Sequence, residues 1–330
     1  QLFVEPEGWN TVEIYVNGFS TSLPEHIQLK ALKLVPGFEN CKMFRPGYAI
    51  EYDYFPPTQL KASLETKLIK NLFFAGQING TTGYEEAACQ GLMAGINAYN
   101  ATHNAEPLVL KRSEAYIGVL IDDLINKGTD EPYRMFTSRA EYRTLLRQDN
   151  ADLRLTKIGY KLGLASQKRV DKVIEKESNI KNILNLFNST TIEPTEAETY
   201  LLQIGSSKMV VKQKLAQLLL RPSVSILEML QSIPSLSEIF KNFDRESLEQ
   251  TEIQTKYDTY LQKEQELVHK MSMLENLQIP SNFDYEKLVS LSTEAKQKFK
   301  KIQPQTLGQA SRISGVNPSD VQILMIYMGR

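Results

Sequence analysis

The stretch from Leu72 to Ala98 combines glycines and small residues in a pattern typical of a ligand-binding loop. Gly76, Gly80 and Gly83 can adopt positive φ angles and allow a ligand to approach the backbone closely. Around them the sequence predicts a short apolar strand over Leu72–Gly76, a loop, and a helix whose first N–H groups can receive oxygen atoms. Small side chains would let this helix lie tightly against another backbone or a flat ring: Ala87, Ala88, Gly91, Ala94 and Gly95.

The charges at the start of this helix limit which part of a ligand it can receive. No G-x-G-x-x-G motif of a dinucleotide site occurs in the chain. Glu85 and Glu86 would repel a pyrophosphate placed there, because like charges repel. They suit hydroxyl groups, such as those of a ribityl chain, or a structural cap. A tight turn between strand and helix without a ligand explains the glycines equally well.

A second candidate segment is the arginine-rich block from Tyr133 to Arg154, with five arginines against three acids. Arg139, Arg143 and Arg147 are spaced by four residues, which predicts one stripe on a helix. Guanidinium groups suit phosphate oxygens, and tyrosines such as Tyr133 and Tyr142 can stack on bases or support the arginines. The alternative is an internal ion-pair network with three acids of the block: Glu141, Asp149 and Asp152.

Composition limits the remaining classes of function. The net charge of -1 means that a nucleic acid would have to meet a local basic face. Cys41 and Cys89 are too few for a disulfide framework or a four-thiolate zinc site, and they fit a reducing, cytoplasmic compartment. No apolar run approaches the roughly 18 residues of a membrane helix. Gln1 follows no initiator Met and begins inside an apparent strand, so we expect an upstream portion of the chain.

The N-terminal third shows strand patterns and the rest shows helical spacing. Strands are predicted at Glu13–Val16 and Tyr48–Tyr54. Between them, Ser22 and Glu25 form the sequence pattern of a capping box for a helix that runs to about Val35. After residue 110 strand alternation disappears. The sequence thus predicts the end of an α/β domain followed by an all-α region.

The helical region is predicted in several pieces. A mostly apolar helix covers Ala115–Ile125, amphipathic helices follow from Ser166 to Met229, and another helix covers Thr255–Leu277. A helix over Glu286–Lys301 precedes the tail. The segment Thr306–Asp320 resembles a helix-turn-helix whose second helix is capped by Asn317 or Ser319, although core packing explains its apolar spacing as well. Four lysines add a basic surface nearby: Lys296, Lys298, Lys300 and Lys301.

Residues Ala75–Ala98 resemble the second signature of the GidA/MnmG family, the flavoprotein subunit of the tRNA wobble-uridine modification complex. The family pattern is A-G-Q-x-N-G-x-x-G-Y-x-E, followed by small residues, Q-G, two aliphatic residues and A-G-x-N-A. Cys89 departs from it, because the family usually has a smaller residue there. Tyr133–Arg143 matches the family segment Y-R-M-F-T-S-R-A-E-Y-R, and Arg45–Asp53 and Leu64–Lys67 match as well.

The resemblance implies that the chain is the C-terminal portion of a larger protein. The implied fold class is α/β, as the C-terminal part of a FAD/NAD(P)-binding Rossmann-like domain, followed by an all-α helical region. The implied parts are the remainder of the FAD-binding domain at 1–110, a helical connector with the arginine block at 111–165, a helical domain at 166–256, and a C-terminal helical domain for partner and tRNA binding at 257–330.

The family reaction adds a carboxymethylaminomethyl group to C5 of the wobble uridine. It uses FAD, NADH as reductant, a one-carbon unit from methylene-tetrahydrofolate, glycine, and an MnmE-type GTPase subunit. The resemblance further implies a homodimer in full length, a cytoplasmic location and no membrane partner. No metal site is expected, and the catalytic residues are unknown because the family's functional cysteines lie upstream of Gln1.

The resemblance also implies binding residues. Those expected to bind FAD are Gly76, Gln77, Asn79, Gly80, Thr81, Thr82, Gly83, Tyr84 and Glu85. Those expected to bind tRNA are Arg134, Arg139, Arg143 and Arg147. Asp53, Glu85 and Glu86 are further candidates for polar contacts near the flavin, with helix caps or hydrogen-bonded structural roles as the alternative. The alternative function is a tRNA- and partner-binding helical module with a purely structural glycine loop.

We expect this 330-residue chain to bind FAD weakly or not at all. The reason is that the pyrophosphate-binding motif implied by the resemblance lies upstream of Gln1. The absorbance spectrum of the purified chain tests this expectation. A flavin band at stoichiometric strength would contradict it.

Overall fold

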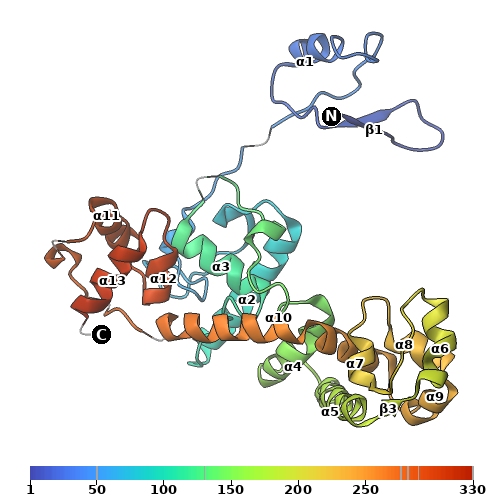
Figure 1. Ribbon diagram of the computed structural model, residues 1–330. Coiled ribbons are helices and arrows are strands. Elements are labelled where there is room, and N and C mark those ends of the chain that lie inside the picture. The colour runs from blue at the N-terminus through green and yellow to red at the C-terminus, as the bar shows by residue number, and fades with distance from the viewer. Residues whose placement is uncertain (50, 130, 276, 281, 289, 329–330) are drawn as a thin grey trace. The chain divides into compact units, whose positions relative to one another are not determined.

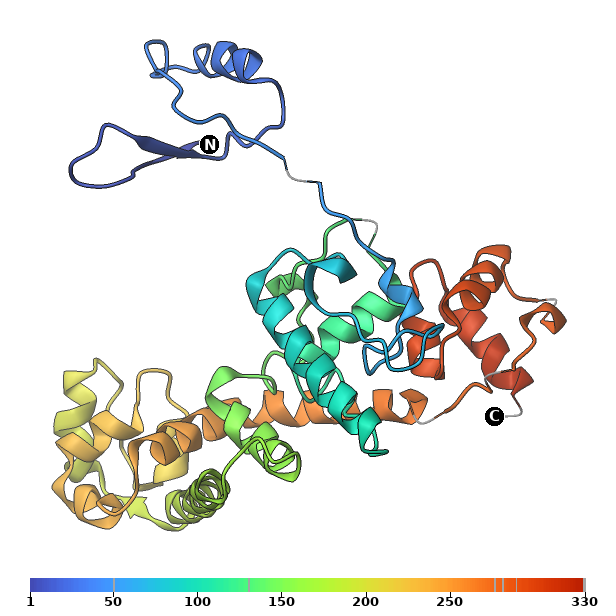
Figure 2. The same cartoon turned by 180° about the vertical axis from the view of Figure 1, so that it is seen from behind.

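The computed structural model describes the chain except residues 50, 130, 276, 281, 289 and 329–330. Two compact units form, Gln1–Tyr54 and Phe55–Arg330. Figures 1 and 2 show the helices and strands of both units from opposite sides. In the part of the chain that is described, no helix is both long and apolar enough to cross a bilayer.

The first unit holds a hairpin and one helix. Strand β1 (Phe3–Pro6) pairs antiparallel with β2 (Ile14–Asn17), in the register that sets Phe3 opposite Asn17. The strand predicted at Glu13–Val16 is thereby confirmed as β2. Helix α1 (Glu25–Leu32) follows. The buried side chain of Gln28 holds the chain around it, because its Nε2 donates to the carbonyl oxygen of Gly47 at 2.8 Å and its Oε1 accepts from Gly47 N at 2.8 Å.

The predicted capping box of this helix is wrong. Pro24 occupies the N-cap position and no side chain caps the helix. The residue before a proline is disfavoured in the α region, so the helix cannot include Leu23 and begins only after Pro24. Ser22 therefore lies before the N-cap and Glu25 is the first helical residue, so the two cannot occupy the N-cap and N3 positions of a capping box.

Two further strands predicted in the N-terminal third do not form. No strand occurs between 48 and 54 in the described residues, and position 50 of that prediction lies outside them. In Leu72–Gly76 only Phe73 makes a single bridge, to Glu65. A strand needs a neighbour to take up its backbone hydrogen bonds. The described strands pair only as two-stranded sheets, β1 with β2 and β3 (Thr191–Ile192) with β4 (Gln213–Lys214), so the Rossmann-like part of the predicted fold is not confirmed.

The second unit begins with a body built on two helices. Helix α2 (Tyr84–Thr102) packs beside α3 (Tyr116–Lys127), which confirms the helix predicted over Ala115–Ile125. Their shared core includes Met93, Leu120 and Leu124 together with Leu60 and Leu64 of the preceding loop. Short 3-10 turns complete the connections at Pro57–Gln59, Gly76–Asn79, Thr137–Arg139, Gln148–Asn150 and Tyr285–Lys287.

A helical domain follows, and its helical character confirms the prediction from residue 166 onward. Its helices are α4 (Ala151–Lys161), α5 (Gln167–Ser189), α6 (Pro194–Gln203), α7 (Leu215–Leu219), α8 (Ile226–Ser232) and α9 (Pro234–Phe240). Their core is closed by Phe187 and Phe240, whose ring centroids lie 5.1 Å apart, and by the fully buried Tyr200.

Helix α10 (Arg245–Glu275) connects this domain to the end of the chain. It starts ten residues before the predicted helix, and Figures 1 and 2 show it running unbroken from the helical domain to the C-terminal bundle. The bundle comprises α11 (Thr293–Ile302), α12 (Leu307–Arg312) and α13 (Pro318–Tyr327). The predicted pair of tail helices is confirmed, and Asn317 forms a capping box with Asp320 at the start of α13.

At two glycines of helices α2 and α3, adding one methyl group should change the free energy of unfolding in opposite directions. A Cβ at Gly118 would lie 2.4 Å from the carbonyl oxygen of Lys111, whereas one at Gly91 would meet nothing within 4 Å. We expect Gly118→Ala to lower the free energy of unfolding by about 1–3 kcal/mol through overpacking. Gly91→Ala should raise it by about 0.5–1 kcal/mol, because alanine loses less backbone entropy in a helix. Urea unfolding measures both, and equal effects would contradict the packing described for α3.

Candidate functional site

The glycine-rich loop folds as a 3-10 turn followed by the start of α2. Gly76 and Gly80 both have positive φ angles, of 83° and 77°, so the backbone doubles back on each side of the turn. Thr81 then forms a parallel bridge with Tyr133, and Gly83 is the N-cap of α2. The three glycines singled out in the sequence thus lie at the turn points of one compact loop.

A buried glutamine in α2 holds this loop in shape. Gln90 Oε1 accepts hydrogen bonds from the backbone N of Gly76 at 3.2 Å and from Nδ2 of Asn79 at 2.8 Å. Gln90 Nε2 donates to Oγ1 of Thr81 at 3.0 Å, and that hydroxyl donates to the carbonyl oxygen of Gly76 at 3.0 Å. Because Asn79 and Thr81 are buried and use these groups inside the loop, they act as its internal support.

The predicted cofactor residues therefore divide into two groups. Gly76, Asn79, Thr81 and Gly83 are buried, and Gly80 is half-buried. The outward residues of the loop are Gln77, Thr82, Tyr84 and Glu85, and the side chain of Tyr84 is 92% exposed. An amide, a hydroxyl and a phenol can donate to ligand oxygens, while the carboxylate of Glu85 opposes a phosphate. This set fits the hydroxyl-bearing part of a flavin better than its pyrophosphate.

One acid of the loop has the hydrogen-bonded structural role that was the alternative to a polar contact near the flavin. Glu86 is buried, and its Oε1 accepts a hydrogen bond from the backbone N of Met135 at 2.9 Å. A Cβ on Gly83 would lie 1.7 Å from Oε2 of Glu86, so a larger residue there would force this folded-back carboxylate to move. In the described residues Oε2 has no hydrogen-bond partner, and neither has Oδ1 of Asn79.

The arginine-rich block does not form the predicted helical stripe. Residues 140–147 form no helix, with a turn at 143–145, and Tyr142 has a positive φ of 51°. The backbone N groups of Leu145 and Leu146 both donate to the carbonyl oxygen of Tyr142, at 3.0 and 2.8 Å, which closes a tight turn there. A left-handed residue cannot continue a right-handed helix. The four-residue spacing of the arginines therefore does not place them on one face of a helix.

The four predicted tRNA-binding arginines fall into two environments. Arg147 is half-buried, its Nε lies 3.1 Å from Oδ1 of Asp149, and it also donates to the carbonyl oxygen of Thr144. Arg134, Arg139 and Arg143 are exposed, and their guanidinium groups make no ion pair or hydrogen bond within the described chain. Arg139 lies over the ring of Tyr133, with Cζ 4.7 Å from the ring centroid.

The three acids of the block do form internal ion pairs, as the alternative predicted. Two of them pair with cations outside the block and not with its arginines. Asp149 pairs with Arg147 of the block. Glu141 pairs with Arg112 at 2.6 Å, and Asp152 pairs with Lys176 at 2.9 Å. The acids of the block are thus neutralised largely from outside it, and its three exposed arginines make no ion pair with a carboxylate of the described residues.

Tyr133 joins the arginine segment to the glycine loop. Its backbone N donates to the carbonyl oxygen of Gly80 at 2.7 Å, and its own carbonyl oxygen accepts from Thr82 N at 3.3 Å. Its phenol donates to Oδ2 of Asp123 at 2.9 Å. Because Tyr133 is only 3% exposed, it cannot stack on a base and instead supports Arg139. Burial, together with Asp123, raises the pKa of its phenol far above the ordinary value.

A buried ion network lies beneath this junction, and no sequence pattern predicted its central arginine. Arg112 Nη1 lies 2.9 Å from Oδ2 of Asp122 and 2.8 Å from Oδ1 of Asp123. Arg312 of α12 takes both carboxylate oxygens of Asp122, at 2.7 and 3.0 Å. Burial disfavours the charge of Arg112, but its hydrogen bonds to Glu141 and the neighbouring aspartates raise its pKa overall. A lone arginine carries no motif that would have signalled this role.

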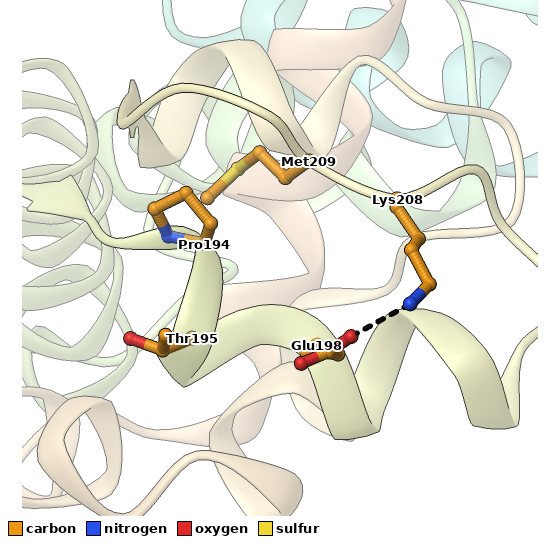
Figure 3. A pocket seen from close by; sticks show the side chains of 5 residues that line it. All are labelled: Pro194, Thr195, Glu198, Lys208 and Met209. Carbon is orange, nitrogen blue, oxygen red and sulfur yellow. Dashed lines mark hydrogen bonds and ion pairs between the residues drawn. The ribbon is translucent and has the colours of Figure 1, made fainter.

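A small surface pocket elsewhere carries none of these residues. It lies beside the start of α6 and is lined by Pro194, Thr195, Glu198, Lys208 and Met209 (Figure 3). Lys208 Nζ is paired with Oε1 of Glu198 at 2.9 Å across its edge. This pairing leaves little free charge for a ligand, and the glycine loop with the arginine segment remains the candidate site.

The network predicts a pH-dependent stability that Asp123 controls. Burial raises the pKa of Asp123, but the hydrogen bond from Lys127 and the charge of Arg112 outweigh it and hold the pKa below the ordinary value. The carboxylate therefore contributes stability above about pH 4, the ordinary pKa of an aspartate, and this stability is lost as the pH falls through the folded-state value.

We expect Asp123→Asn to lower the free energy of unfolding at pH 7 by about 3 kcal/mol, because it leaves buried cations without their partner. The difference from the unsubstituted chain should shrink as the pH falls from about 5 to 3. Asp258→Asn, at an exposed position of α10, is the matched control and should change stability by less than about 0.5 kcal/mol. A pH-independent difference for Asp123→Asn would refute the assignment.

Three family models match the chain and together cover more than three quarters of it. "Glucose inhibited division protein A" matches residues 1–106. The models "tRNA modifying enzyme MnmG/GidA C-terminal helical domain" and "tRNA modifying enzyme MnmG/GidA C-terminal helical bundle" match residues 167–265 and 267–330. The last two meet within α10 (Arg245–Glu275).

Individual relatives match over the whole chain. The "tRNA uridine 5-carboxymethylaminomethyl modification enzyme MnmG" of Cytophaga hutchinsonii is 60% identical over 100% of this chain and 53% of its own length. The protein of the same name from Flavobacterium johnsoniae is 59% identical, with the same coverage. The structure of Aquifex aeolicus GidA in its form II crystal is 44% identical with a TM-score of 0.78, over 100% of this chain and 52% of that one. The chain spans about half the length of the curated relatives it matches.

Proposed function

The chain belongs to the GidA/MnmG family, and on that basis we propose that it is part of a FAD-dependent tRNA-modifying enzyme. The proposed reaction adds a carboxymethylaminomethyl group to C5 of the wobble uridine, with NADH as reductant and an MnmE-type GTPase as partner. The proposed parts are 1–110, 111–165, 166–256 and 257–330, although the last boundary falls inside α10. A homodimer, a cytoplasmic location and tRNA binding by the C-terminal helices belong to the same proposal.

The glycine loop is proposed to contact the flavin. Gln77, Thr82 and Tyr84 offer outward donors and acceptors for the hydroxyl groups and the ring edge of FAD. The positive φ angles of Gly76 and Gly80 shape the loop, and Gln90 fixes it from beneath. A bound flavin would supply the redox chemistry, while these residues would orient it and limit its contact with water.

The arginine segment is proposed to bind tRNA. Arg134, Arg139 and Arg143 are exposed and keep their hydrogen-bond donors for phosphate oxygens. The observation that carries the proposal is the direct backbone pairing of Tyr133 with Gly80 and Thr82. It brings the start of the arginine segment next to the proposed flavin loop, so that bound RNA and flavin would be neighbours. Arg147 is proposed to contribute by holding the segment, since Asp149 already occupies it.

A second candidate function is a tRNA- and partner-binding module whose glycine loop has only a structural role. The internal hydrogen bonds of Asn79, Thr81 and Gln90 favour this reading, because they make the loop stable without a ligand. The outward side chains of the loop distinguish the two. In a flavoenzyme of full length, Gln77→Ala should weaken FAD binding, whereas in a structural loop it should leave FAD binding unchanged.

Binding of a tRNA transcript with an unmodified wobble uridine tests the proposed role of the arginines. Arg134→Ala, Arg139→Ala and Arg143→Ala should each weaken binding about 5- to 10-fold and reduce its dependence on salt concentration, because each removes about one phosphate contact. Their melting temperatures should stay within about 1–2 °C of the unsubstituted chain, in keeping with a change of less than about 0.5 kcal/mol at exposed sites.

Two further arginines serve as controls for this experiment. Arg147→Ala should lower the melting temperature, since it breaks the pairing with Asp149. Arg245→Ala removes an exposed arginine at the start of α10 that is already paired with Glu249, and it should leave tRNA affinity unchanged. If all three exposed arginines behaved like Arg245, the tRNA-binding face would have to lie elsewhere.

A further inference from the structure

The turn that follows Arg143 is held by a carboxylate from a distant helix. Glu264, in the second half of α10, accepts hydrogen bonds through Oε1 from Oγ1 of Thr144 at 3.0 Å and from its backbone N at 3.4 Å. Its other oxygen, Oε2, accepts from the backbone N of Leu145 at 3.0 Å. Both carboxylate oxygens are therefore used on two successive residues, directly beside Arg143.

The same helix holds the segment at a second point. Gln250 Nε2 donates to the carbonyl oxygen of Asp149 at 3.0 Å and also to its carboxylate, and Gln250 Oε1 lies 3.4 Å from Nη2 of Arg147. Residues 144–149 are thus attached to α10 at both ends. The backbone between these attachments forms no α-helix, so these side-chain contacts add to the few backbone hydrogen bonds that shape it.

We propose that Glu264 is a positioning residue for tRNA binding, which fixes the backbone of Thr144 and Leu145 and thereby the direction in which Arg143 projects. This inference rests on the proposed function and adds a residue that no motif marks. Hydrogen bonds from backbone N–H groups to a carboxylate are charge-assisted and stronger than neutral ones. On the other side of Arg143, the carbonyl oxygen of Tyr142 accepts from the backbone N groups of Leu145 and Leu146, so Glu264 adds to a turn that already begins at Tyr142.

Because Glu264 is charged, the proposal can be tested by whether neutralising it increases or decreases the affinity for tRNA. A carboxylate beside a phosphate-binding surface opposes RNA binding through its charge. If Glu264 had no positioning role, its neutralisation would leave the affinity for tRNA unchanged or increase it. If it holds Arg143 in place, neutralisation decreases the affinity.

The first experiment compares Glu264→Gln with Glu266→Gln in the full 330-residue chain, with an unmodified tRNA transcript as the probe. Glutamine keeps the shape of Glu264 but turns one acceptor oxygen into an N–H donor that faces another N–H. We expect Glu264→Gln to weaken binding at least 5-fold. Glu266 is exposed on the same helix with no ion pair or hydrogen bond to a described side chain, so Glu266→Gln should leave binding unchanged or slightly tighter.

A double-mutant cycle separates positioning from a general loss of structure. In an Arg143→Ala background, Glu264→Gln should have little further effect on tRNA affinity, because the side chain that it positions is gone. In an Arg134→Ala background the two effects should add, since Arg134 lies on the other side of Tyr142. Additivity in both backgrounds would overturn the proposal, and so would equal affinities of the Glu264→Gln and Glu266→Gln variants.

A measurement without RNA reports on the contact itself. Trypsin cleaves after arginine, so the rate of cleavage between Arg143 and Thr144 should rise in Glu264→Gln and stay unchanged in Glu266→Gln. Should Glu264→Gln fail to fold, Thr144→Ala removes the hydroxyl contact to Oε1 from the opposite side and should weaken tRNA binding in the same direction.

The outcomes also distinguish this inference from the function on which it rests. If Arg134→Ala, Arg139→Ala and Arg143→Ala all leave the affinity for tRNA intact, both the proposed tRNA-binding role and the inference about Glu264 are overturned. If Arg143→Ala weakens binding while Glu264→Gln behaves like Glu266→Gln, only the positioning role of Glu264 is overturned.

Discussion

The second unit of this protein depends on the buried guanidinium of Arg112. It is 8% exposed and lies within hydrogen-bond distance of carboxylates of Asp122, Asp123 and Glu141. Charges taken out of water are costly, and each member of such a group is tolerable only while its partners are present. The arrangement therefore does more to specify which elements meet than to add net stability. Helix α3 contributes two of the three acids and becomes the element to which the others attach.

Three parts of the second unit attach to this network. Asp123 accepts the hydrogen bond of the Tyr133 phenol, and Tyr133 carries the backbone pairing with the glycine loop. Glu141 ties the arginine segment to Arg112, and Asp122 receives Arg312 from the C-terminal bundle. These acids are used in the network, and within the described residues Arg134, Arg139 and Arg143 make no ion pair with a carboxylate. Because these acids are paired with other cations, a chain with a net charge of -1 can present a local cationic surface.

The sequence correctly predicts features that depend only on residues close together in the chain. The apolar run of α3 and the Asn317 cap of α13 depend on neighbours within a few residues, and both form where expected. The stripe of Arg139, Arg143 and Arg147 failed because Tyr142 is left-handed and its turn is held by Glu264, about 120 positions further along the chain. The four-residue spacing of the arginines carries no information about a contact so distant in the chain. The predicted strands at 48–54 and 72–76 lacked partners, which alternation alone does not reveal.

The pattern of glycines predicts the loop at the candidate site but not which of its residues turn inward. The glycines and the outward Gln77 lie on the predicted loop, whereas Asn79 and Thr81 turn inward because Gln90 offers them partners from the next helix. Arg112 escaped attention for a related reason. A single charged residue in a sequence shows no sign of the partners that folding brings to it.

The unbroken course of α10 makes its length matter more than most of its side chains. Gln250, Glu264 and Glu275 make their contacts from one helix. They are separated by about four turns and about three turns, so all three project from nearly the same side. A single inserted or deleted residue between them would rotate the following part of the helix by about 100° and shift it by about 1.5 Å. Insertions that a surface loop absorbs without harm would here turn the C-terminal bundle away from α3.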